Sequence, residues 1–135
     1  MSTLLDKPYL IDFSKIGEPS LGYISVAEKT NLPFTPKRIY WTYFTPEDVE
    51  RGGHAHIELE QILIAVAGKI KVSIGLVNGK IFEFNLDKPN LGVYIPKKSW
   101  RNMKYSHNAV QICIASIEYD EDDYIRNHKE FLDLK

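Results

Sequence analysis

The segment 51–61, RGGHAHIELEQ, carries two histidines one residue apart and a carboxylate four positions later. In an extended strand, residues two apart project from the same face, so His54 and His56 would point together. Gly52 and Gly53 allow the backbone to turn there or to approach a ligand closely. Three roles therefore fit the histidines: metal ligands, a metal-free acid/base pair, or ordinary side chains at the rim of a sheet.

A metal site could use His54, His56 and Glu60, because imidazole and carboxylate groups bind zinc, iron, manganese and nickel. These residues also fit the first half of the metal-binding motif of cupins. The second half would supply another histidine from the segment 96–101, PKKSWR, but Arg101 occupies that position. Arginine has no acceptor and stays charged, so it cannot ligate a metal. We therefore expect no metal and no other cofactor, and a metal-dependent cupin enzyme is kept as an alternative.

As an acid/base pair, His54 and His56 could move a proton between adjacent carbons of a substrate, because histidine titrates near neutral pH. This chemistry needs a C–H bond activated by a neighbouring ketone and donors that stabilise the enolate. Tyr40, Tyr43 and Arg51 are residues of a suitable type.

Alternation of apolar and polar residues predicts an all-β fold. Segments 69–76 and 80–86 alternate in this way, and Asn78-Gly79 between them is a strong hairpin signal. Further segments rich in β-branched and aromatic residues are expected to be strands: 23–28, 38–44, 60–68, 92–96 and 110–116. Many short strands separated by turn residues predict an antiparallel sandwich or barrel of the jelly-roll type.

The C-terminal segment 120–134, DEDDYIRNHKEFLDL, predicts the chain's helix, with the acidic run 120–123 as a solvated helix N-terminus. The single Cys113 lies inside a strand-like run, which favours a buried core thiol and a reducing cytoplasm. No linker or repeat interrupts the chain, so residues 1–135 are expected to form one domain.

Charge and hydropathy argue against two classes of partner. The formal net charge of −1 gives no electrostatic reason to expect nucleic acid or an anionic membrane. No apolar run approaches the roughly 20 residues that cross a bilayer, and the start of the chain lacks the pattern of a secretory signal. We expect a cytoplasmic protein with no nucleic-acid or membrane partner.

Three separated motifs resemble the sugar 3,4-ketoisomerases, WxcM-like cupins that act on thymidine-diphosphate-linked 4-keto-6-deoxyhexoses. These motifs are RGGHAHIELEQILIAVAG at 51–68, LDKPNLGVYIPKKSWRNM at 86–103 and YDEDDYIRNHKEFL at 119–132. The resemblance runs from about residue 22 to residue 132. It implies a cupin jelly-roll β-barrel with a short C-terminal helix, no metal requirement, and a homodimer that exchanges N-terminal strands.

The resemblance also implies an activity: the keto group of a nucleotide-linked deoxysugar moves from C4 to C3, a step toward deoxyamino sugars of surface glycans. It identifies His54 and His56 as the catalytic pair, with Tyr40 beside them. Tryptophan and tyrosine offer stacking surfaces for the base, and arginine suits the diphosphate. The candidate substrate-binding residues are Arg51, Gln61, Tyr43, Tyr94, Trp100 and Arg101.

One position departs from the family. Where the family carries an active-site arginine in an acidic-Arg-Gly-Ser segment, this chain has Leu21 before Gly22. Leucine cannot bind an anion or polarise a carbonyl. The departure leaves open a different substrate, compensation by another arginine such as Arg101, or lost catalysis. A non-catalytic cupin that binds a nucleotide sugar is therefore the second alternative.

Overall fold

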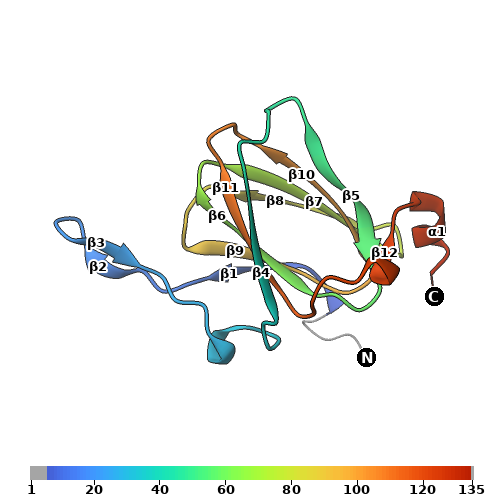
Figure 1. Cartoon of the computed structure of the whole chain (residues 1–135), viewed down its shortest axis with the longest axis horizontal. Coiled ribbons are helices and arrows are strands. Elements are labelled where there is room, and N and C mark those ends of the chain that lie inside the picture. Colours follow the sequence, from blue (N-terminus) through green and yellow to red (C-terminus); the bar gives the residue numbers. More distant parts are fainter. Residues whose placement is uncertain (1–5, 135) are drawn as a thin grey trace.

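The computed structural model describes residues 6–134, in which nearly all regular structure is β-strand. Two five-stranded antiparallel sheets form the body of the molecule (Figure 1). The first sheet has the order β1 (Tyr9–Asp12), β9 (Leu91–Ile95), β6 (Gln61–Ala67), β11 (Val110–Ala115) and β4 (Arg38–Tyr43). The second has the order β12 (Tyr124–Ile125), β5 (Glu50–His56), β10 (Ser99–Tyr105), β7 (Ile70–Leu76) and β8 (Ile81–Leu86). The expected jelly-roll fold is confirmed.

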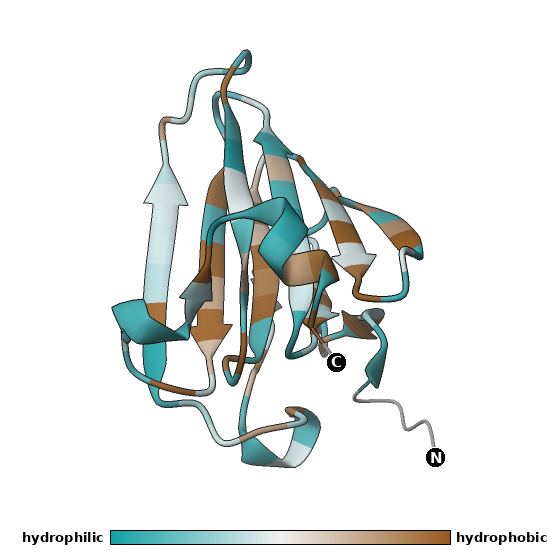
Figure 2. Cartoon of the chain, turned by 90° about the vertical axis from the view of Figure 1, so that its right-hand side faces the viewer, coloured by the Kyte–Doolittle hydropathy of each residue, from teal (hydrophilic) through white to brown (hydrophobic). Residues whose placement is uncertain are grey.

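The main core lies between the two sheets. Strands β6, β9 and β11 contribute residues such as Leu63, Val93 and Cys113, and strand β7 contributes Val72 and Ile74. Figure 2 shows the apolar and polar residues alternating along the strands, as a half-buried sheet requires. The thiol of Cys113 is buried, as expected.

A second apolar cluster covers the outer face of the first sheet. Ile62, Ile64 and Tyr94 point away from the main core and pack against Phe13 from the N-terminal segment. Strand β6 is consequently buried on both faces over residues 61–65. This two-sided burial explains why its sequence is a continuous apolar run.

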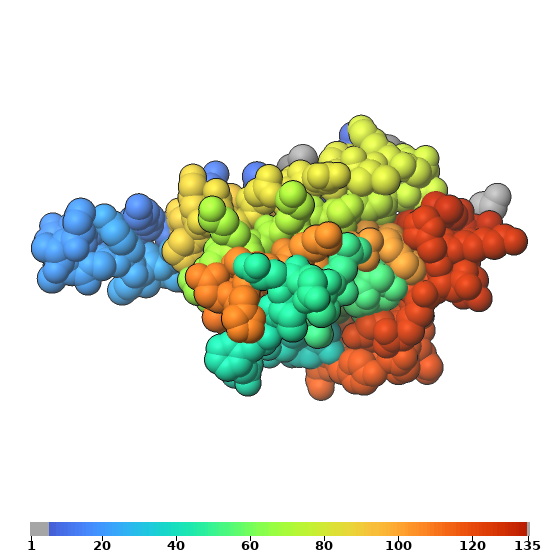
Figure 3. Space-filling view, turned by 90° about the horizontal axis from the view of Figure 1, so that it is seen from above, coloured from blue at the N-terminus to red at the C-terminus, as the bar shows by residue number. Residues whose placement is uncertain are grey.

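A two-stranded hairpin, β2 (Ile16–Glu18) and β3 (Gly22–Ile24), projects from the barrel (Figures 1 and 3). The expected strand 23–28 was wrong in its extent, because the extended pairing ends at Ile24 and the 3-10 turn η2 (Lys29–Asn31) follows. Leu21 lies in the hairpin turn and is 83% exposed.

The C-terminal segment is not one helix from residue 120. It forms a 3-10 turn, η3 (Glu121–Asp123), then β12, then the helix α1 (His128–Leu132). The backbone of Tyr124 and Ile125 pairs with β5, which excludes a continuous helix there. In residues 6–134 no helix is long and apolar enough to cross a membrane.

A β-bulge shapes the strand that carries the two histidines. Opposite β10, His54 pairs with Arg101 while Gly52 pairs with Asn102, so Gly53 is the extra residue. Both glycines have positive φ, at 94° and 71°, a conformation that other residues rarely adopt. The bulge lets Arg51 and His54, three residues apart, line the same cavity.

Replacing Gly52 by alanine should destabilise the fold. The new Cβ would lie 2.6 Å from the carbonyl oxygen of Arg101, in addition to the strain of a positive φ. Positive-φ strain alone costs about 1–3 kcal/mol. Gly79→Ala is the matched control, because Gly79 has a φ of 91° and no atom within 4 Å of an added Cβ. Urea unfolding should show a larger loss for Gly52→Ala; equal losses would contradict the importance of this close approach.

Candidate active site

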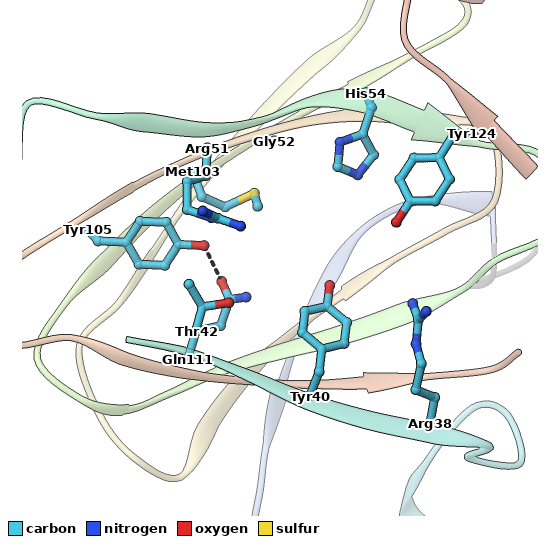
Figure 4. Close-up of a pocket in the computed structure, with 10 residues that line it drawn as sticks. All are labelled: Arg38, Tyr40, Thr42, Arg51, Gly52, His54, Met103, Tyr105, Gln111 and Tyr124. Atoms are coloured by element: carbon cyan, nitrogen blue, oxygen red, sulfur yellow. Dashed lines mark hydrogen bonds between the residues drawn. The ribbon is translucent and has the colours of Figure 1, made fainter. Parts of the chain in front are cut away.

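A cavity of about 290 Å³, open to solvent on one side, lies between the two sheets. Figure 4 shows the ring of His54 and the hydroxyl groups of Tyr40 and Tyr124 directed toward one another across it. Its lining is Arg38, Tyr40, Thr42, Arg51, Gly52, His54, Met103, Tyr105, Gln111 and Tyr124.

The structure brings several of the predicted site residues together, at two depths. His54, Tyr40 and Arg51 line the cavity. His56 is only 2% exposed and lies behind His54, with 4.9 Å between the two ring centroids. The expectation that the two histidines share a face is met, but only His54 is open to the cavity.

Gln61 and Arg101 form a buried layer next to Tyr40. Arg101, 1% exposed, donates from Nη1 to Oε1 of Gln61 and from Nη2 to the carbonyl of Ser99 at 3.1 Å. Gln61 Nε2 in turn donates to the Tyr40 hydroxyl at 2.9 Å. Because arginine only donates, it fixes the orientation of the Gln61 amide, and Tyr40 must accept from it.

This chain of donors leaves the proton of Tyr40 available to an acceptor in the cavity. The Cys113 thiol faces Tyr40 across the strand pair and is a weak acceptor. Burial raises the pKa of Tyr40 above its usual value, and Cys113 adds to this, while the Arg101 charge and the bond from Gln61 act in the opposite direction. Tyr40 is therefore a protonated donor at neutral pH.

Both histidines are held in the neutral form. Burial lowers the pKa of His54 to about 4, and the positive charge of Arg101 contributes, while the Gly52 backbone acts in the opposite direction. Burial and Arg101 also lower the pKa of His56. A neutral imidazole can accept a proton, so His54 can act as a base at neutral pH.

Of the expected substrate-binding residues, Arg51 lines the cavity and Gln61 and Arg101 lie in the buried layer next to Tyr40, whereas the other three point elsewhere. Strand parity places Tyr43 on the outer face of β4, opposite to Tyr40, where it is exposed. Tyr94 is fully buried on the outer face of the first sheet, against the ring of Tyr9. Trp100 packs on the helix residues His128 and Phe131, on the face of β10 opposite to Arg101.

The alternative metal site is not assembled. Glu60 accepts a hydrogen bond from the Tyr94 hydroxyl at 2.6 Å, away from the histidines. Among residues 6–134, no group of three or more His, Cys, Asp and Glu side chains is placed to hold a metal ion.

Sequence reasoning missed several residues of the site, and three of them are charged or contact the histidines. Arg38 and Tyr124 line the cavity, and Tyr124 packs 5.0 Å from the ring of His54 and 4.2 Å from that of His56. Asp123 is 7% exposed, and its Oδ2 lies 3.3 Å from Nδ1 of His56. It is therefore not part of a solvated helix end. Arg38 could have been found, because it precedes Tyr40 by two residues on an expected strand.

A small jelly-roll barrel with a neutral imidazole and phenols around an internal cavity defines a cupin with an acid/base site. The chain belongs to the FdtA family, described as WxcM-like, C-terminal, which matches residues 6–135. It is 36% identical over 124 residues, 90% of this chain and 88% of the relative, to the TDP-4-oxo-6-deoxy-α-D-glucose-3,4-oxoisomerase of Aneurinibacillus thermoaerophilus.

Solved structures agree with this membership. The sugar 3,4-ketoisomerase QdtA of Thermoanaerobacterium thermosaccharolyticum, in complex with TDP, has a TM-score of 0.89 and 33% identity, covering 97% of this chain and 95% of that one. A 3,4-ketoisomerase from Helicobacter canadensis has a TM-score of 0.87 and 35% identity, covering 93% of this chain and 94% of its own.

The lowered pKa of His54 should be visible in solution. In the unfolded chain His54 has its usual pKa of 6.5, whereas in the folded protein its pKa is about 4. The contribution of neutral His54 to stability is thus complete above pH 6.5 and is lost as the pH falls toward 4. NMR titration should show His54 neutral at pH 5, and the acid-induced loss of unfolding free energy should be smaller in His54→Asn. Protonation near pH 6.5 would contradict the burial argument.

Proposed function

We propose that the chain is a sugar 3,4-ketoisomerase that moves the keto group of a TDP-linked 4-keto-6-deoxyhexose from C4 to C3. The observation that carries this proposal is the convergence of a neutral imidazole, His54, and a protonated phenol, Tyr40, on one internal cavity. Support comes from relatives: QdtA was solved with TDP, and a histidine-to-asparagine variant of it with TDP-4-keto-6-deoxyglucose.

The proton transfers assign a role to each group. His54 removes the proton from C3, which is acidic because it lies next to the C4 ketone, and an enediolate forms between C3 and C4. Tyr40 donates to O4, where negative charge develops. The proton held by His54 is then delivered to C4, and Tyr40, which has given its proton to O4, takes up the proton of the C3 hydroxyl as the new carbonyl forms. No oxidant or reductant is consumed, because the sugar's own electrons are redistributed.

The cavity also supplies positive charge for the diphosphate. Arg38 and Arg51 both line it, and guanidinium groups bind phosphate oxygens well. Leu21 does not line this cavity. Arg101 also does not, since it is buried and bonded to Gln61 and Ser99, so we assign the compensating charge to Arg38 instead.

We further propose a homodimer that works in the cytoplasm, in the synthesis of deoxyamino sugars. Within residues 6–134 the hairpin of β2 and β3 pairs with no other strand, and it exposes Ile16, Tyr23 and Ile24. An isolated hairpin is at best marginally stable in water, so a second copy of the chain is the partner expected to hold it. The buried reduced Cys113 fits a cytoplasmic location.

Conversion of TDP-4-keto-6-deoxyglucose to the 3-keto product, followed by NMR, tests the activity. We expect turnover by the wild type and a loss of at least about 100-fold in kcat for His54→Asn, because a general base contributes that much. His107→Asn, the same change at an exposed histidine outside the cavity, should behave as the wild type. Binding of the nucleotide sugar by the wild type without any conversion would replace this function by the non-catalytic alternative.

The exposed outer face of β4 offers a test of the dimer. Ile39, Trp41 and Tyr43 lie on it, and Trp41 is 62% exposed, an apolar surface of the kind that marks interfaces. Sedimentation should show a wild-type dimer and a shift toward monomer for Trp41→Glu, since a carboxylate buried in an apolar interface without an opposite charge is destabilising. Asn85→Glu, on the polar outer face of β8, should leave the dimer intact. A monomeric wild type would contradict the proposal.

A further inference from the structure

We propose that Asp123 is a positioning residue of the isomerase, acting on the catalytic His54 through His56 and Tyr124. The inference rests on the proposed function and deepens it. Asp123 does not line the cavity. Its effect on the reaction must therefore pass through the side chains that it orients.

Asp123 is anchored from two directions. Its Oδ1 accepts from the backbone N–H of Glu58 at 2.8 Å, and its Oδ2 accepts from that of Leu59 at 3.1 Å. Its carbonyl accepts from the backbone N–H of Ile57 at 3.1 Å. These bonds join the C-terminal segment to the loop that follows β5, directly after His56. The carboxylate is thus fixed at the end of the strand that carries both histidines.

From this place Asp123 reaches the buried side of His56. The Nδ1 atom of His56 is buried and lies 3.3 Å from Oδ2 of Asp123, too poorly aligned for a well-formed hydrogen bond. Catalytic hydrogen bonds often align only when substrate is bound. A carboxylate beside Nδ1 favours the tautomer with the proton on Nδ1, which leaves Nε2 unprotonated.

Tyr124, the residue after Asp123, links the position of Asp123 to that of His54. Tyr124 follows Asp123 in the chain, and its backbone pairs with His56. Its ring lies 5.0 Å from His54 and 4.2 Å from His56, and the two imidazoles meet edge to face at 89°. The three rings therefore pack on one another, so a shift of Asp123 moves the surface against which His54 rests.

Such positioning predicts an effect on turnover rather than on affinity. A displacement of about 1 Å in a catalytic group can cost about 100-fold in rate. For Asp123→Asn we expect kcat to fall by about 10–100-fold with KM within about threefold of the wild type, because the arginines assigned to the diphosphate, Arg38 and Arg51, are not replaced. Asp122→Asn is the matched control: the same change at the preceding residue, which is exposed and outside the cavity.

The experiment combines steady-state kinetics with ¹⁵N NMR of the histidine rings, assigned through His56→Asn. In the wild type at neutral pH, His56 should be neutral with its proton on Nδ1, and Asp123→Asn should change its tautomer populations while Asp122→Asn does not. A proton on Nε2 in the wild type would overturn the inference even if Asp123→Asn fails to fold. Wild-type kcat in a folded Asp123→Asn protein would also overturn it. Absence of wild-type turnover would instead refute the proposed function, so the two failures are distinguishable.

Discussion

The close approach of Gly52 to the carbonyl of Arg101 is the backbone constraint on which the site depends. An added Cβ would lie 2.6 Å from that oxygen, so the position requires glycine. The bulge that this approach allows changes the parity of β5: Arg51 and His54 both face the cavity, although they are three residues apart. The two glycines before the histidines are therefore part of the active-site architecture and not simply a flexible entrance.

The bulge also places His54 opposite Arg101, and the buried charge of Arg101 then sets the protonation of its neighbours. No carboxylate pairs with its guanidinium among residues 6–134; Gln61 and the Ser99 carbonyl accept from it instead. Burial lowers the pKa of Arg101 to about 10, which still leaves it charged at neutral pH. That charge and burial favour neutral imidazoles, while the bonds through Gln61 leave Tyr40 able to donate. One cation thereby supports both the base and the acid.

The sequence was sufficient for the jelly roll and for the shared face of His54 and His56, because both follow from the period of two in strands. It could not place Tyr43, Tyr94 and Trp100, since their faces depend on which strand pairs with which. Tyr94 and Trp100 lie on outer faces of the sheets that other segments of the chain cover. Both are therefore aromatic side chains packed against protein, like the side chains that line a pocket. Asp123 was misassigned for a related reason: an acidic run resembles a helix start until its backbone pairing with β5 is known.

The central claim is that His54 is the group that exchanges a proton with C3 of the sugar. Its most direct test is deuterium exchange: the enzyme is incubated in D2O with TDP-4-keto-6-deoxyglucose, the reaction is stopped at partial conversion, and the remaining substrate is recovered. We expect deuterium at C3 with the wild type and none with a His54→Asn protein that still binds TDP. Exchange at C3 that persists in His54→Asn would contradict the assignment of His54 as the base.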